Sequence, residues 1–161
     1  MMREKILQVI EKNSRIDLKE LAIILGVEEA DVVVEMHKME EEGIICGYHT
    51  LIDWEKLSLD KVNALIEVRV TPQRGMGFDN IAERIYKYPE VTAVYLMSGG
   101  FDLLVILEGK SLREISSFVS DKLSTLDTVL STATHFILKK YKDHGTVLTK
   151  KRVDEREIFT P

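Results

Sequence analysis

The sequence predicts an α+β protein of two domains, a winged or simple helix-turn-helix domain followed by a ferredoxin-like βαββαβ domain. Apolar side chains recur at helical spacing through the first 43 residues. From residue 62 onwards they alternate as in strands, with two helical stretches between the strands. The chain has 161 residues, enough for two small domains. The expected segments are residues 1–48 for the helix-turn-helix, 49–61 for a linker strand and connector, 62–141 for the second domain and 142–161 for a basic tail.

Three helices are predicted in the first domain. Residues 3–12 form the first helix, since Ile6, Val9 and Ile10 share one face. The second begins at the sequence DLKE, residues 17–20, which has the spacing of a capping box. We expect this helix to end at a glycine and to bury the apolar side chains Leu21, Ala22, Ile24 and Leu25.

The third helix is predicted over residues 29–42. Its buried face carries Val32, Met36 and Met39. The sequence IICGYHTLI follows at 44–52, and its β-branched residues favour an extended strand. Three short helices and a strand indicate a helix-turn-helix module whose third helix takes the position that reads DNA.

The second domain alternates strands and helices in the order βαββαβ. Strands are predicted at 64–70, 91–97, 103–108 and 132–141, and a first helix at 78–85. The sequence SLRE at 111–114 is a capping box that opens the second helix. We expect that helix to bury Leu112, Ile115, Val119 and Leu123.

Both helices of a ferredoxin-like domain cover one face of its sheet, so the other face must lie in water or against a partner. The sequence LLVIL at 103–107 is apolar at every position, which is typical of a strand buried on both faces. We therefore predict that a second copy of the chain covers the open face in a two-fold homodimer. The alternative is an apolar edge strand without a partner.

Composition and charge narrow the class of protein. Apolar residues make up 45% of the chain, yet no run approaches the roughly 20 residues that span a membrane. The single cysteine, Cys46, rules out an internal disulfide and disfavours a zinc site. We expect a cytoplasmic protein without a metal or cofactor. Residues 1–48 carry 6 Lys/Arg against 11 Asp/Glu, whereas residues 139–161 carry 7 against 4.

Four local sequences resemble the leucine-responsive/asparagine-regulator family, Lrp/AsnC, which is also called the feast/famine family. They are ILQVIEKNSRIDLKELAIILGV at 6–27, MEEEGII at 39–45, YPEV at 88–91 and SGGFDLLV at 98–105. The resemblance covers residues 3–140 and implies a transcriptional regulator that dimerises through its C-terminal domain and often assembles into octamers. It also implies that an amino acid or similar metabolite binds between subunits.

The motif and the resemblance together suggest which residues contact DNA. In helix-turn-helix proteins the third helix lies in the major groove and the preceding helix crosses the backbone. The candidates are Lys19, Glu29, Ala30, Val33, Val34, His37 and Lys38. The basic tail, with Lys139, Lys140, Lys142, Lys150, Lys151 and Arg152, is expected either to reach DNA or to pack on the dimer.

The third helix departs from the family pattern. The family has a serine cap at Glu28, small polar or basic residues at Val33 and Val34, and usually a basic residue at Glu35. Residues 27–43 hold seven acids and one lysine, although phosphates attract Lys and Arg. The helix dipole explains acids in the first turn. Two functions therefore stay open: a DNA-binding regulator, or an effector-sensing module that works through protein partners, for example beside a more basic paralogue.

The turn SGGFD is the candidate effector site. Paired glycines let a backbone approach a ligand closely, and the Asp102 carboxylate can bind the amino group of an amino acid. The family resemblance places the effector near this loop, and two threonines of the last strand are plausible further contacts. The candidates are Ser98, Gly99, Gly100, Asp102, Thr132 and Thr134. The alternative is a plain β-turn with Asp102 as a turn residue.

An enzyme is not expected. The four histidines show no metal-ligand spacing, and the sequence lacks both a nucleophile elbow and a phosphate-binding glycine loop with lysine. The decarboxylases of alternative haem biosynthesis share the two-domain outline. Against that alternative, GGFDLLVILEG resembles the turn of the regulators.

Overall fold

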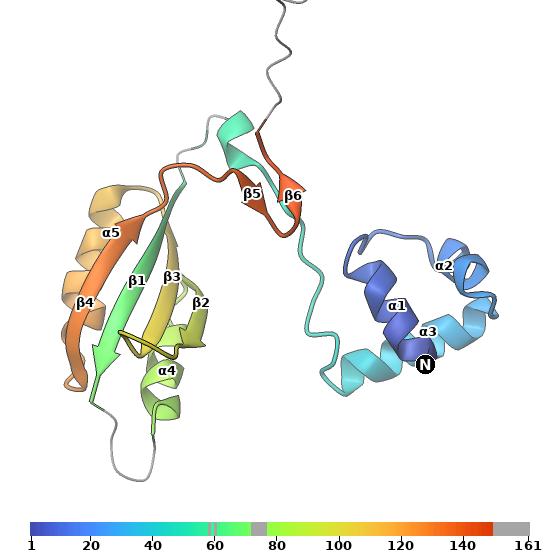
Figure 1. The fold of residues 1–161 in the computed structure, drawn as a ribbon, viewed down its shortest axis with the longest axis horizontal. Coiled ribbons are helices and arrows are strands. Elements are labelled where there is room, and N and C mark those ends of the chain that lie inside the picture. Colours follow the sequence, from blue (N-terminus) through green and yellow to red (C-terminus); the bar gives the residue numbers. More distant parts are fainter. Residues whose placement is uncertain (58, 60, 72–76, 150–161) are drawn as a thin grey trace, which may run out of the picture. The chain divides into compact units, whose positions relative to one another are not determined.

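The computed structural model describes residues 1–57, 59, 61–71 and 77–149. The chain divides into two compact units, Met1–Leu51 and a second unit that begins at Ile52. Figure 1 shows a helical first unit and a second unit built on a sheet. The first unit therefore extends slightly beyond residue 48, the end expected from the sequence.

The first unit consists of three helices, α1 (Met2–Ile10), α2 (Leu18–Leu25) and α3 (Glu29–Glu41). Each helix contributes two side chains to a shared core, which contains Ile6, Ile10, Leu21, Ala22, Val32 and Met39. The three predicted helices are confirmed, with ends that differ by one or two residues. Since the unit is small, this core of six buried residues is what holds the helices together.

Local chemistry sets the turn between α2 and α3. The Asp17 side chain caps α2 by accepting hydrogen bonds from the N–H groups of Lys19 and Glu20. Gly26 ends the helix in the left-handed conformation, with φ of 67°, which a residue without Cβ adopts at little cost. At the start of α3, the Glu28 side chain makes no cap hydrogen bond.

Two expectations for the first unit are wrong. Ile24 is 57% exposed, because α2 is apolar nearly all round and only Leu21 and Ala22 are fully buried, while Leu25 is partly buried against the core. The expected strand at 44–52 does not form. Instead, the N–H groups of Ile44 and Ile45 both donate to the carbonyl of Met39, which closes the end of α3. The helix-turn-helix is therefore of the simple type, without a wing.

The second unit has the βαββαβ order that the sequence predicts. Its elements are the short helix η1 (Trp54–Leu57), β1 (Val62–Val70), α4 (Asp79–Tyr86), β2 (Val91–Leu96), β3 (Leu103–Gly109), α5 (Leu112–Phe118), the helical turn η2 (Val119–Leu123) and β4 (Val129–Phe136). The strands form one antiparallel sheet in the order β2-β3-β1-β4. This arrangement confirms the predicted ferredoxin-like fold.

Alternation along the central strands separates a covered face from an open face. In β1 the even-numbered residues from Ala64 to Val70 are buried, and in β3 so are Leu103, Val105 and Leu107. They pack against α4 and α5, which both lie on this side of the sheet (Figure 1). Leu65 and Ile106 are paired on the opposite face and are only half-buried.

Three details of the second unit differ from expectation. Leu112 is 55% exposed rather than buried, since it lies at the first position of α5. The last strand covers Val129–Phe136 instead of 132–141. The expected tail contains a hairpin of β5 (Lys142–Asp143) and β6 (Thr146–Val147). Lys150, Lys151 and Arg152 of that tail, and most of the expected loop at 71–77, lie outside the described residues.

The β5–β6 hairpin closes through a two-residue turn in which both residues have positive φ. His144 has a φ of 43° and Gly145 a φ of 79°. Turns of this kind match the right-handed twist of a hairpin and favour glycine at the second position. The dipeptide His-Gly is therefore the local cause of a hairpin inside a segment whose composition indicated only a solvated tail.

Within the described part of the chain, no helix is long and apolar enough to cross a membrane.

Candidate functional sites

The outward face of α3 is apolar and acidic. Val32 and Met39 are buried, and Val34 lies about 200° around the helix from Val32. Val33 and Val34 are 43% and 50% exposed. All seven candidate DNA contacts are exposed, with Lys19 on α2 and the other six on α3. All seven predicted contacts are therefore accessible to a partner, on the last two helices of the helix-turn-helix.

An ionic cluster that includes Arg3 links α1 to α3. Arg3 Nε donates to Glu35 Oε2 at 2.7 Å, and its terminal nitrogens donate to the Glu42 carboxylate at 2.7 and 3.0 Å. Lys38 Nζ donates to Glu35 Oε1 at 3.2 Å. Sequence reasoning missed this role of Arg3, because the pairing joins residues more than thirty positions apart.

The cluster holds its carboxylates in the ionised state. Hydrogen bonds from Arg3, and then from Lys38, lower the pKa of Glu35, and the Arg3 hydrogen bond lowers the pKa of Glu42. The same contacts raise the pKa of Arg3. Glu35 is thus a structural partner of α1, which accounts for an acid where the family has a basic residue. Because Glu35 also accepts a hydrogen bond from Lys38, the positive charge of Lys38 is partly neutralised within the chain.

The remaining candidate cations of this surface differ in their surroundings. The ring nitrogens of His37 lie 3.7 Å from Glu40 Oε2 and 3.4 Å from Glu41 Oε1. Lys19, by contrast, makes no salt bridge within the described part of the chain. Lys19 is therefore the candidate whose charge is best available to a phosphate.

The candidate effector turn connects β2 to β3. Ser98, Gly99 and Gly100 are exposed, and Gly99 has a φ of 141°, a conformation that other residues rarely adopt. A Cβ added at Gly99 or Gly100 would meet no atom within 4 Å, so open space surrounds both positions. The turn is accessible to a ligand or to another chain.

Asp102 has a clear structural role beside this turn. Its Oδ2 accepts a hydrogen bond from the Val70 N–H at 2.8 Å, and its own N–H donates to the Val68 carbonyl at 3.1 Å. The regular pairing of β1 with β3 ends at Val68, and the pairing of β1 with β4 is irregular between Arg69 and Val70. The two hydrogen bonds of Asp102 hold β1 in place at this end. Asp102 therefore fixes the end of β1, as a turn residue would.

The two candidate threonines lie on one face of β4, as predicted. Thr132 pairs with Val68 and Thr134 with Ile66, and both partners are buried on the helix-covered side of the sheet. Strand β1 lies between β4 and β3, so it separates the threonines from the turn at 98–102. One copy of the chain does not bring the six candidate effector residues together.

In the described part of the chain, no group of three or more His, Cys, Asp or Glu side chains is placed to hold a metal ion. The candidate residues of the sequence thus lie in three places, on the helix-turn-helix, in the turn at 98–102 and on β4.

A helix-turn-helix unit joined to a ferredoxin-like ligand-binding domain defines a class of two-domain transcriptional regulators. The model of the Lrp/AsnC ligand binding domain matches residues 63–147, more than half of the chain. The protein belongs to the Lrp/AsnC family, as its sequence motifs indicated.

The similar proteins are regulators. The uncharacterized HTH-type transcriptional regulator YugG of Bacillus subtilis is 48% identical over 158 residues, which cover 98% of this chain and 95% of that protein. The proline dehydrogenase transcriptional activator of Rhodobacter capsulatus is 30% identical in sequence, over 84% of this chain and 87% of that protein. Among solved structures, a Neisseria meningitidis transcriptional regulator in complex with L-Met superposes with a TM-score of 0.71. The match covers 88% of this chain and 91% of that chain, with 26% sequence identity. These relatives confirm a regulator rather than an enzyme.

Proposed function

We propose that this protein regulates transcription in the cytoplasm by binding double-stranded DNA through its helix-turn-helix, under the control of an amino acid bound by its C-terminal domain. The observation that carries the proposal is the exposure of the seven candidate DNA contacts on a helix-turn-helix, in a chain of the Lrp/AsnC family. The L-Met complex of a similar regulator supports an amino acid as the effector.

The active form in this proposal is a homodimer, with octamers as a further assembly. The open face of the sheet supports it, because Leu65 and Ile106 pair there and Tyr95, paired with Leu104, is 52% exposed. Exposed apolar side chains that gather on one face of a sheet are typical of a surface that binds a partner. A second copy of the chain would remove these side chains from water.

The effector would bind between copies rather than within one. In a single chain β1 lies between the turn at 98–102 and the threonines of β4, which supports a pocket that is completed by a second copy. Backbone N–H groups of the turn would hold the carboxylate of the amino acid. Asp102 would receive its ammonium group.

DNA binding is tested by the salt dependence of an electrophoretic shift with the region upstream of the protein's own gene. Each phosphate contact adds about 0.9 to the slope of log affinity against log salt. We expect Lys19→Ala to lower the slope by about that amount. Lys87→Ala, at the position directly after α4, is the control, since it removes the same charge from the other unit. No shift at low salt, with and without amino acids, would contradict DNA binding.

A second candidate function is regulation through a protein partner bound to the helix-turn-helix. The specific observation is that Arg3 and Lys38 are paired with acids while Val33 and Val34 are exposed. A partner with a basic rim around an apolar centre would complement this face. Under this alternative Val34→Asp abolishes capture of the partner, whereas Lys19→Ala does not affect it.

A further inference from the structure

The first turns of α3 determine which base a helix-turn-helix of this kind can recognise, because that part of the third helix meets base edges. The segment EADVVVEM at 29–36 contains no lysine or arginine. Guanine offers two acceptors in the major groove, which lysine and arginine bind, whereas thymine offers a methyl group that an apolar side chain can contact. This part of α3 therefore lacks the side chains that read guanine.

The centre of the outward side of α3 is apolar. Ala30 and Val34 are each two residues from the buried Val32, so both lie on the opposite side of the helix, about 160° from it by the shorter way. Both are exposed, Val34 at 50%. Val33 is also exposed and lies at the edge of this side, about 100° from Val32. The methyl groups of these three residues are accessible to a base.

The acids of α3 lie beside this apolar centre. Glu29 and Asp31 are three residues and one residue from Val32, which places them about 60° and 100° from the buried side. Glu35 is bound to Arg3 of α1 at 2.7 Å. The carboxylates near Val34 in the sequence therefore point away from the direction of Ala30 and Val34.

The cations of this surface have other roles. Lys38 binds Glu35 at 3.2 Å and lies in the last turn of α3. Lys19 is on α2, and a lysine there fits a phosphate, which positions the protein without selecting a base. Affinity from Lys19 and base selection by α3 can therefore be tested separately.

We propose that α3 selects thymine through its methyl group, with Val34 as the central contact and Ala30 and Val33 beside it. The inference rests on the proposed DNA binding and adds to it the base that the helix reads. The sites that the protein prefers then carry thymine, and not guanine, where Val34 meets the major groove.

Uracil tests this contact, since it pairs as thymine does and lacks only the methyl group. The full-length protein first selects a site from a pool of random DNA duplexes at low salt. Each thymine of the selected site is then replaced singly by uracil. We expect binding to weaken about fourfold at one or more positions, which is the effect of one buried methyl group.

Val34→Ala identifies the residue that makes the contact. This variant should bind thymine and uracil equally at a position where the wild type discriminates. Val147→Ala is the matched control, because Val147 is 64% exposed on β6 of the other unit and loses the same two methyl groups. We expect this control to discriminate as the wild type does.

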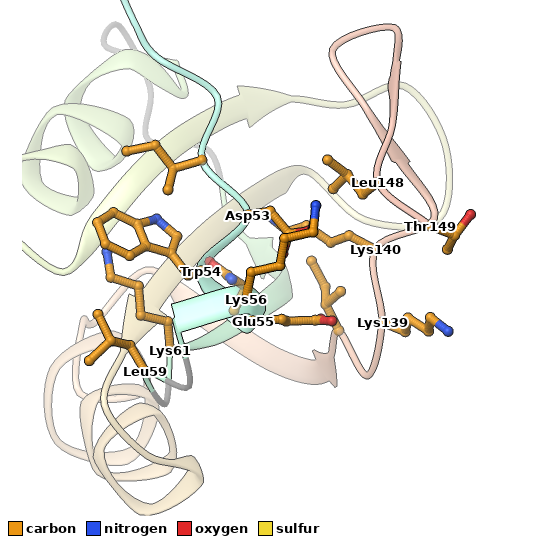
Figure 2. Close-up of a pocket in the computed structure, with 13 residues that line it drawn as sticks. Asp53, Trp54, Glu55, Lys56, Leu59, Lys61, Lys139, Lys140, Leu148 and Thr149 are labelled. Carbon is orange, nitrogen blue, oxygen red and sulfur yellow. The ribbon is translucent and has the colours of Figure 1, made fainter. Parts of the chain in front are cut away.

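The fold of Val34→Ala is checked in both units. Alanine favours a helix more than valine does, so the far-UV circular dichroism of α3 should be retained. The single tryptophan, Trp54, is half-buried and lines a cavity of about 430 Å³ in the second unit. Leu59, before β1, and Leu148, after β6, also line this cavity (Figure 2). The emission of Trp54 should be the same in Val34→Ala and in the wild type.

The possible failures are distinguishable. Equal binding of thymine and uracil by the wild type at every position would overturn the reading of thymine and leave DNA binding intact. A Val34→Ala variant that still discriminates as the wild type does would also overturn it. Failure to bind any duplex at low salt would overturn the proposed function, and this inference with it.

Discussion

Arg3 Nε of α1 donates a hydrogen bond of 2.7 Å to Glu35 Oε2 of α3, so the first helix of the chain is tied to the helix expected to read DNA. The same guanidinium also binds Glu42 near the end of α3. Glu35 in turn binds Lys38. The charge available to a phosphate on this surface therefore depends on pairings within the unit, and these pairings can be altered one at a time.

Acid should weaken the link between α1 and α3. The Arg3 hydrogen bonds lower the pKa of Glu35 and of Glu42 below the ordinary value of 4.5. Their contribution to stability is therefore complete above pH 4.5 and is lost as the pH falls through the folded-state pKa. Thermal unfolding followed by far-UV circular dichroism should show this loss in the wild type. Arg3→Met should flatten it, whereas Lys5→Met, which removes an exposed cation of α1, should not.

Glu35→Gln should strengthen DNA binding at low salt. Glutamine removes the negative charge that neutralises Lys38, and one additional phosphate contact would steepen the salt slope by about 0.9. Glu11→Gln makes the same charge change at an exposed position at the end of α1. A slope that changes equally in both variants would mean that net charge, and not the release of Lys38, is responsible.

Two substitutions of Asp102 should separate its structural role from a role in effector binding. Asp102→Ala leaves the N–H of the buried Val70 without its acceptor and should cost about 1 kcal/mol of stability. Asp102→Asn keeps an acceptor oxygen and should retain the melting temperature. If the carboxylate binds the ammonium of an amino acid, both variants lose the stabilisation by ligand. Full ligand stabilisation of Asp102→Asn would limit Asp102 to the structural role.

Ile106→Glu should convert the assembly into single chains, because it places a charge in the middle of the open sheet face. Light scattering after size exclusion measures the mass directly. Leu112→Glu introduces the same charge at an exposed position of α5 and should leave the assembly intact. An unchanged mass of Ile106→Glu would place the contact between copies elsewhere.

The elements that the sequence predicts well are those with a strong local signal. Asp17 and Gly26 mark the ends of α2, and alternation in β1 identifies the buried face of the sheet. Burial on short apolar stretches is harder to predict. Ile24 lies in a helix that is apolar nearly all round, so periodicity cannot select the buried side.

Contacts between segments that are distant in the sequence could not be predicted from local sequence patterns. The segment at 44–52 has the composition of a strand, but its first N–H groups close the end of α3 instead. Arg3 and Glu35 meet only after the helices pack. The cavity at Trp54 likewise requires the segment after β4 to fold back beside η1.

The single cysteine and the single tryptophan of the chain lie in different units, so energy transfer between them can measure a distance. Cys46 is exposed in the first unit, and Trp54 lies in the second, a few residues beyond the boundary at Leu51. The sequence contains no other cysteine or tryptophan. A thiol-reactive acceptor dye on Cys46 would therefore have one donor, Trp54, in each copy of the chain. Changes in the distance between the two units, on adding DNA or an amino acid, become measurable in the unaltered protein.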